Sequence, residues 1–148
     1  MPSPSARRLL PIVLAYLPVP IVGAILSAAW GVGASPEGGP GDMFLRGTAL
    51  TPPLFLPAAL LVAAMAARRE GSAGRIGAGF VSLISLAFLA GSTFNLPNDF
   101  AAADSAGTPL ALTAGLAGIH IALSLSLLYN AVPRLSGRGA AIPATGTA

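Results

Sequence analysis

Residues 109–132 constrain the fold more than any other stretch, because they contain no Asp, Glu, Lys or Arg. A helix of this length reaches across the roughly 30 Å hydrocarbon core of a bilayer. The chain's only histidine, His120, lies near the middle of the stretch. Three further apolar stretches precede it, at residues 9–31, 51–67 and 77–96. The sequence therefore predicts an all-α integral membrane protein, a four-helix bundle with short loops embedded in the lipid bilayer.

The composition supports lipid as the solvent of this chain. Of its 148 residues, 54% are hydrophobic and 9% are charged, whereas about 25% of the residues in a soluble domain are charged. The net charge of +3 does not indicate nucleic-acid binding, because the basic residues are scattered around apolar stretches. The absence of cysteine excludes disulfides and thiolate metal sites. Because every basic residue is arginine and Ala, Gly and Pro are abundant, we expect a bacterial cytoplasmic membrane.

The charges are distributed unevenly between the predicted loops. Seven of the eight basic residues precede the first stretch, separate the second from the third, or follow the fourth: Arg7, Arg8, Arg68, Arg69, Arg75, Arg134 and Arg138. The other two loops hold Arg46 and four of the five acidic residues: Glu37, Asp42, Asp99 and Asp104. Short loops rich in arginine stay in the cytoplasm. We therefore expect both termini to be cytoplasmic, with an N-terminus at 1–8, a membrane domain at 9–133 and a disordered tail at 134–148.

A cleaved signal peptide is the alternative interpretation of residues 1–29. Arg7 and Arg8 precede an apolar run that ends near the small residues Ser27 and Ala29. The run is longer than the roughly 7–15 residues of a signal-peptide core. The spanning-helix interpretation is therefore preferred, and cleavage stays open.

Prolines and polar residues predict where the helices bend and end. Pro18 and Pro20 predict a bend in the first helix, because each removes a backbone donor. Thr51 is expected to cap the second helix and Pro133 to stop the fourth. The Gly- and Pro-rich residues 32–47 predict a loop, and a second loop is predicted from residue 97 to Thr108.

Small residues recur along the first and fourth stretches. Gly23 and Ser27 lie four residues apart, and Gly115 and Gly118 lie on one face of the fourth helix. Small residues at this spacing let helices approach closely in a membrane. We therefore expect these four residues to pack helices together. The same reasoning predicts that Gly118→Leu disrupts packing more than His120→Gln.

His120 is the centre of a candidate polar site inside the membrane. An ionisable side chain at this depth is costly and indicates function by default. Ser85 lies at matching depth, and Tyr16 is within reach from a tilted first helix. A structural hydrogen bond from His120 to either residue is one interpretation, and a role in binding a ligand or proton is the other. One face of the fourth helix carries Thr113, Ala117, His120 and Ser124. We expect this face either to line a polar cleft or to meet a second subunit.

The sequence offers no catalytic constellation. One histidine without cysteine or intramembrane carboxylates does not supply a metal site, so no metal or cofactor is predicted. Asp99 and Asp104 lie in loops roughly 15 Å or more from the midplane, too far to complete a serine triad. A membrane enzyme acting on a lipid-soluble substrate through His120 stays a remote alternative.

The leading functional prediction is a non-enzymatic accessory or structural membrane subunit. The small-residue stripes favour a homo-oligomer or a membrane partner protein. The alternative is a small oligomeric transporter or channel that uses the His120 region, because proline-broken helices at membrane depth often line binding sites.

Overall fold

The computed structural model describes residues 4–136, with side chains from Arg8 onward, and most of these residues are helical. In order, the elements are α1 (Pro4–Tyr16), α2 (Pro18–Trp30), the 3-10 helix η1 (Pro40–Phe44), α3 (Phe55–Ala67), α4 (Gly71–Phe94), α5 (Leu96–Ser105) and α6 (Leu110–Leu135). Apart from an isolated bridge between Thr48 and Thr51, residues 4–136 form no β-pairing. The all-α prediction is confirmed.

Three of the helical segments are long and apolar enough to cross a membrane: Arg8–Trp30, which combines α1 and α2, Gly71–Phe94 and Leu110–Leu135. Helix α3 has 13 residues, about 20 Å at 1.5 Å per residue, which is shorter than a bilayer core of about 30 Å. Large apolar side chains such as Ile25, Leu83 and Leu125 are more than half exposed on the outer surface. The helices thus fit a membrane protein, while the four-span count stays a prediction.

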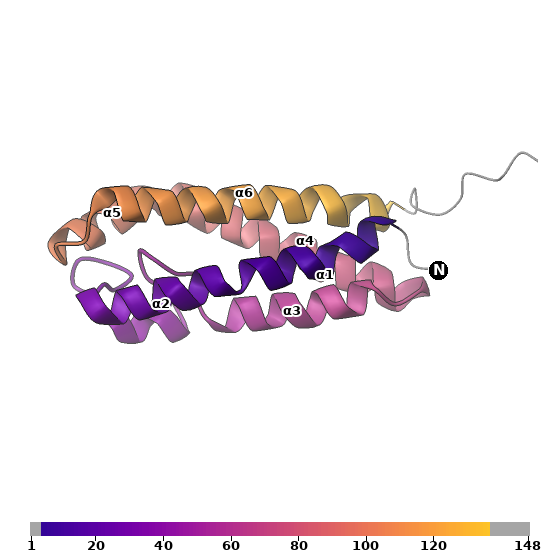
Figure 1. Ribbon diagram of the computed structural model, residues 1–148, viewed down its shortest axis with the longest axis horizontal. Helices are drawn as coiled ribbons and strands as arrows, with labels where there is room; N and C mark the ends of the chain where they lie inside the picture. Colours follow the sequence, from indigo (N-terminus) through magenta and orange to yellow (C-terminus); the bar gives the residue numbers. More distant parts are fainter. Residues whose placement is uncertain (1–3, 137–148) are drawn as a thin grey trace, which may run out of the picture.

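The helices run side by side along the long axis of the molecule, which gives it two distinct ends (Figure 1). The start of α1, the link between α3 and α4, and the end of α6 lie together at one end, named here the arginine end. Residues 31–54 and α5 lie at the other, named here the loop end. Among the residues whose side chains are described, the two groups of charges predicted to face opposite sides therefore sit at opposite ends. Which end faces the cytoplasm stays a prediction.

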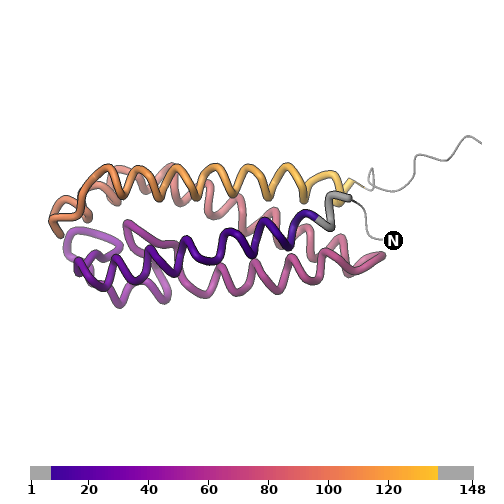
Figure 2. The backbone as a smooth tube through the Cα atoms, viewed as in Figure 1, coloured from indigo at the N-terminus to yellow at the C-terminus, as the bar shows by residue number. Residues whose placement is uncertain are grey.

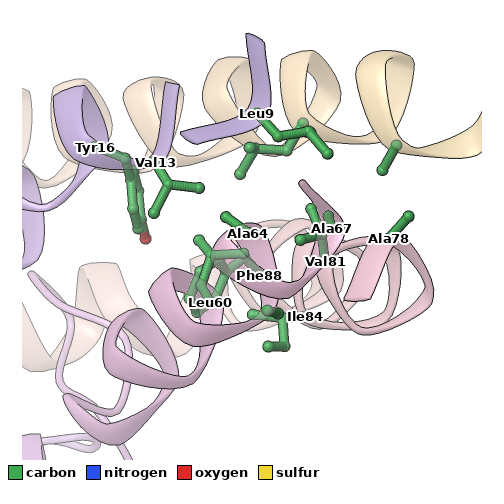
Figure 3. Packing of buried hydrophobic residues seen from close by; sticks show 13 residues of the cluster. Leu9, Val13, Tyr16, Leu60, Ala64, Ala67, Ala78, Val81, Ile84 and Phe88 are labelled. Atoms are coloured by element: carbon green, nitrogen blue, oxygen red, sulfur yellow. The ribbon is translucent and has the colours of Figure 1, made fainter. Parts of the chain in front are cut away.

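The arginine end has a close-packed apolar core. Figure 3 shows side chains of α1 facing those of α3 and α4, with Leu9, Val13, Leu60 and Val81 fully buried. Helices α3 and α4 approach so closely that a Cβ on Gly77 would overlap backbone atoms of α3. Side-chain substitution there would require the helices to separate.

Arg134 fastens the end of α6 to the α3–α4 link. Its Nε donates to the Gly74 carbonyl oxygen at 3.4 Å, and a second guanidinium nitrogen donates to the Arg69 carbonyl oxygen. These bonds satisfy carbonyl groups at the helix hairpin. The Arg134 side chain therefore joins α6 to α4 and to the link that precedes α4.

The loop end is assembled differently, because α2 packs on a loop. Residues 31–54 fold back beside α2 (Figure 2). A Cβ on Gly23 would overlap the Leu50 carbonyl oxygen, and Ser27 Oγ lies 2.5 Å from Thr48 Oγ1. Thr51 Oγ1 donates to the Pro20 carbonyl oxygen at 3.0 Å. The Gly23–Ser27 stripe thus lies against a loop of this chain. The sequence predicts instead that this stripe packs against another helix.

Several helices extend beyond the predicted spans or end elsewhere. The first helix begins at Pro4, although its candidate membrane span, Arg8–Trp30, agrees within one residue with the predicted 9–31, and α4 begins at Gly71, six residues before the predicted start at 77. Helix α3 begins at Phe55, because Thr51 bonds to Pro20 and does not cap it. Pro133 lies inside α6, which continues to Leu135. A proline in the last turn removes one donor but keeps a helical φ, so the helix ends two residues later.

Two short helices replace predicted loops. Helix η1 lies within residues 32–47, and α5 lies within the segment expected to be a loop before Thr108. Helix α5 has Pro97 in its first turn, where the missing backbone donor costs nothing. Most of the predicted tail 134–148 lies outside the described residues. At the bend predicted near Pro18–Pro20, the structure has a break in the helical hydrogen bonding after Leu17, between α1 and α2, while Leu17 itself keeps helical dihedral angles and donates to the Val13 carbonyl oxygen.

Candidate functional site: a polar cavity at the loop end

Tyr16 and His120 form a buried pair at the centre of the molecule. Tyr16 is the last residue of α1, where the break before Pro18 ends the helix, and His120 lies midway along α6. Tyr16 Oη and His120 Nδ1 are 2.9 Å apart and hydrogen-bonded. The Tyr16 ring meets the imidazole edge-on, and it also lies 5.5 Å from the Phe88 ring. Both side chains are thereby held in one orientation.

Ser85, the third residue of the predicted polar site, does not join this pair. It is completely buried on α4, and its hydroxyl has no hydrogen-bond partner. Of the two hydrogen bonds that the sequence suggested for His120, the structure forms the one to Tyr16. Whether these three residues make a functional site stays a prediction.

The polar face of α6 points into the protein. Thr113, His120 and Ser124 are each at least 95% buried, and Ala117 is half-buried on the same face. The hydroxyls of Thr113 and Ser124, and His120 Nε2, have no hydrogen-bond partner. Buried polar groups are normally bonded, so a cluster of unbonded ones marks a place where a ligand or water belongs.

A cavity of about 210 Å³ connects this region with the loop end. Its deep part is lined by His120 and Phe88, both buried, and by Ala117. Its outer lining includes Arg46, Asn95 and Asn98, which are exposed. The remaining lining comes from residues 47–53, Leu56, Ala34, and the α4 and α5 residues Ala87, Gly91, Ser92 and Asp99. A polar molecule of moderate size therefore has a continuous lining from the surface down to the histidine.

Two charged side chains line the outer part of the cavity. Burial raises the pKa of Asp99 from an ordinary value of 3.8 to about 6, because desolvation penalises the carboxylate. Asp99 and Arg46 form no ion pair with any of the described residues. The cavity thus has a cation and an anion in its outer lining and the side chain of His120 in its deep lining.

Sequence analysis missed the outer residues of this cavity. The sequence predicts Arg46, Asn98 and Asp99 in loops and Asn95 at the end of the third stretch, whereas their positions in the structure depend on η1 and α5. The signal available was Pro97 two residues before Asp99, which is typical of a helix start. A helix that starts at this proline carries Asn98 and Asp99, and α5 places both residues in the cavity lining.

Gly115 and Gly118 lie away from the cavity. Both are exposed, and a Cβ at either position would have no heavy atom within 4 Å. They therefore pack no helix of this chain. Packing against a second molecule stays a prediction for these two glycines.

No protein-family model, curated protein or solved structure matches this chain. Its function is therefore inferred from its own residues. Among the described residues, His and acidic side chains form no group of three that could hold a metal ion.

Proposed function

We propose that this chain is a non-enzymatic membrane protein that binds a small polar molecule in the cavity, which the molecule enters from the loop end. The single observation that carries the proposal is the continuous lining from exposed Asn98 to buried His120, whose Nε2 has no partner. Concave sites with a few convergent polar groups are the usual form of small-molecule sites. The apolar core at the arginine end supports entry from one end only.

Cysteine labelling tests this proposal, because the chain has no native cysteine. Ala117→Cys places a thiol in the cavity lining and leaves the Tyr16–His120 bond intact. Ala131→Cys is the matched variant on the same helix, in the fully buried core. In membrane vesicles, we expect a membrane-impermeant thiosulfonate to label position 117 only from the side that holds α5. Position 131 should be labelled from neither side.

Asp104→Cys identifies the side, because Asp104 is exposed on α5. Labelling of position 117 from the opposite side, or from neither, would contradict entry from the loop end. Protection of both 117 and 131 would show that water does not reach the cavity.

A transporter is a related candidate, supported by the helix break at Leu17. This break directly follows Tyr16, so a change in the angle between α1 and α2 would act on the His120 hydrogen bond. Broken helices beside a binding site are a recurrent feature of transporters. This version requires a second opening at the arginine end. Solute flux that is unaffected by His120→Ala would exclude it.

An accessory or structural subunit is the second candidate, supported by the open face of α6. Gly115 and Gly118 leave room for another helix, from a second copy or a membrane partner, to approach closely. Crosslinking in native membranes tests this role. Purification of the detergent-extracted protein as a lone monomer, without crosslinked partners, would count against it.

A further inference from the structure

The outer part of the cavity lies just beyond the ends of two candidate membrane spans. The spans Arg8–Trp30 and Gly71–Phe94 both end at the loop end (Figure 1), and each ends in an exposed aromatic side chain. Aromatic side chains, indoles above all, favour the boundary between the hydrocarbon core and water. Asn95, which directly follows Phe94, belongs to the exposed outer lining of the cavity. In a membrane, this lining therefore lies at the level of the lipid headgroups.

The loop that contributes to the lining has the same arrangement. Phe44 and Leu45 are exposed apolar side chains, and Arg46, which follows them, is exposed in the outer lining. Leu45 is 79% exposed and Phe94 is 80% exposed. Apolar side chains of this size are unfavourable in water and favourable against acyl chains. The polar lining thus begins next to a lipid-facing side chain at two places, Leu45–Arg46 and Phe94–Asn95.

Arg46 and Asp99 give this outer lining one full charge of each sign. Neither side chain forms an ion pair or a hydrogen bond with any of the described residues. Asp99 is half-buried, so its carboxylate has lost part of its hydration. A ligand with a single charge would pair with one of the two side chains and leave the other without a counter-ion. A zwitterionic ligand supplies a partner to both.

We propose that the cavity binds the headgroup of a zwitterionic phospholipid, with the phosphate on Arg46 and the ammonium group on Asp99. A guanidinium donates two parallel hydrogen bonds to phosphate oxygens, which suits Arg46 to this group. The headgroup enters from the bilayer, and the acyl chains stay in the lipid beside Leu45 and Phe94. This inference rests on the proposed binding function and adds the chemical class of the ligand and its source.

Native mass spectrometry of the full chain in detergent tests the inference, with lipids that carry identical oleoyl chains. Phosphatidylethanolamine has both charged groups, whereas phosphatidylglycerol keeps the phosphate and lacks the ammonium group. We expect phosphatidylethanolamine to bind about tenfold more tightly. Free phosphoethanolamine has the same headgroup without acyl chains, and we expect it to bind at least about tenfold more weakly than the lipid.

Charge-removing variants locate the two contacts. Asp99→Asn should abolish the preference for phosphatidylethanolamine, and Arg46→Gln should weaken the binding of both lipids about tenfold. Asp104→Asn and Arg75→Gln are the matched controls, because they remove the same charges at exposed positions outside the cavity lining. We expect both controls to leave the affinities unchanged.

Equal affinities for the two lipids, or an unchanged preference in Asp99→Asn, would overturn the inference. Phosphoethanolamine that binds as tightly as the lipid would show that the ligand comes from water, and would overturn the lipid source. In either case, labelling of Ala117→Cys from the α5 side in phosphatidylglycerol vesicles would leave the proposed binding function standing. Binding of none of the three probes, together with protection of position 117, would overturn both.

Discussion

The arginine end and the loop end share the long helices α4 and α6 but are packed by different means. At the arginine end, glycine lets α3 and α4 touch backbone to backbone, and the interior is apolar. At the loop end, residues 46–53 replace a helix against α2, and a cavity that extends from exposed Arg46 to buried His120 lies inside. Helices in lipid are held by close contact, because lipid is as apolar as the core. The loop end has fewer close helix contacts than the arginine end, so a binding function is expected at the loop end.

The largest expected difference between the ends comes from adding a side chain to a glycine of α4. In Gly77→Val the new side chain overlaps the α3 backbone, so we expect a loss of about 3 kcal/mol in the free energy of unfolding. Gly91→Val makes the same substitution on the same helix at the loop end, where a Cβ meets no atom within 4 Å. Denaturation by sodium dodecyl sulfate, followed by circular dichroism, measures both.

Equal losses at the two glycines would break the comparison, because they would show that helix propensity and not packing sets the cost. Since the residue change is identical, propensity effects cancel between the two variants. A larger loss for Gly91→Val would place the tight contact at the loop end.

Removing side chains from α3 gives the second test. Leu60 is fully buried in the core, so Leu60→Ala should leave a void and cost about 2 kcal/mol. Leu56 lies one turn away and borders the cavity, so Leu56→Ala only enlarges a space that exists and should cost about half as much. Thermal unfolding in detergent measures the two variants side by side. If Leu56→Ala proved the costlier change, the loop end would be close-packed in solution.

The helical class of the fold and the polar face of α6 could be predicted from the sequence, because both depend on residue type. Apolar stretches without charges require helices in lipid, which accounts for the all-α fold and for the inward polar face of α6. The Tyr16–His120 bond was one of two options, because matching depth is readable from helix rise. Ser85 has the same depth, but rotation about the helix axis decides which side chain reaches the imidazole.

The contacts that depend on one helix meeting another could not be predicted. Gly77 is one of several glycines in α4, and only the position of α3 distinguishes it. The small residues Gly23 and Gly118 have the same sequence pattern, yet one contacts a loop and the other contacts nothing in the chain. The cavity depends on the fold of residues 46–53 and α5, where local turn signals do not determine the tertiary position.

The pH dependence of stability sharpens the comparison at Asp99. Its folded pKa of about 6 lies above the ordinary 3.8, so the unfolded chain releases its proton first as pH rises. The stability contributed by Asp99 is therefore full below pH 3.8, declines up to about pH 6 and is lost above it. Asp99→Asn should remove this decline and raise the free energy of unfolding at pH 7 by about 1 kcal/mol, since water still screens part of the carboxyl.

Unfolding measured between pH 4 and pH 8 tests this decline, with Asp104→Asn as the control. Asp104 is exposed on the same helix and does not line the cavity. Arg46, the other charged residue at the cavity mouth, is unchanged in both variants. The same pH profile for Asp99→Asn and the unchanged protein would show that water surrounds the Asp99 carboxyl, and the cavity mouth would then be wider than the structure has it.

The smallest expected effect is at Gly118, and it corrects the order that the sequence suggested. Because none of the described residues has a heavy atom within 4 Å of a Cβ added to Gly118, Gly118→Leu should change the unfolding free energy of the isolated protein by less than about 0.5 kcal/mol. His120→Gln should cost more, because it removes the imidazole ring that is hydrogen-bonded to the buried Tyr16 hydroxyl and packed against its ring. Gly118→Leu therefore acts on association alone. If it reduces crosslinking of native membranes while monomer stability is unchanged, the outer face of α6 binds a partner independently of the cavity. If it unfolds the monomer, a helix of this chain packs there, and the open face of α6 does not exist in the membrane.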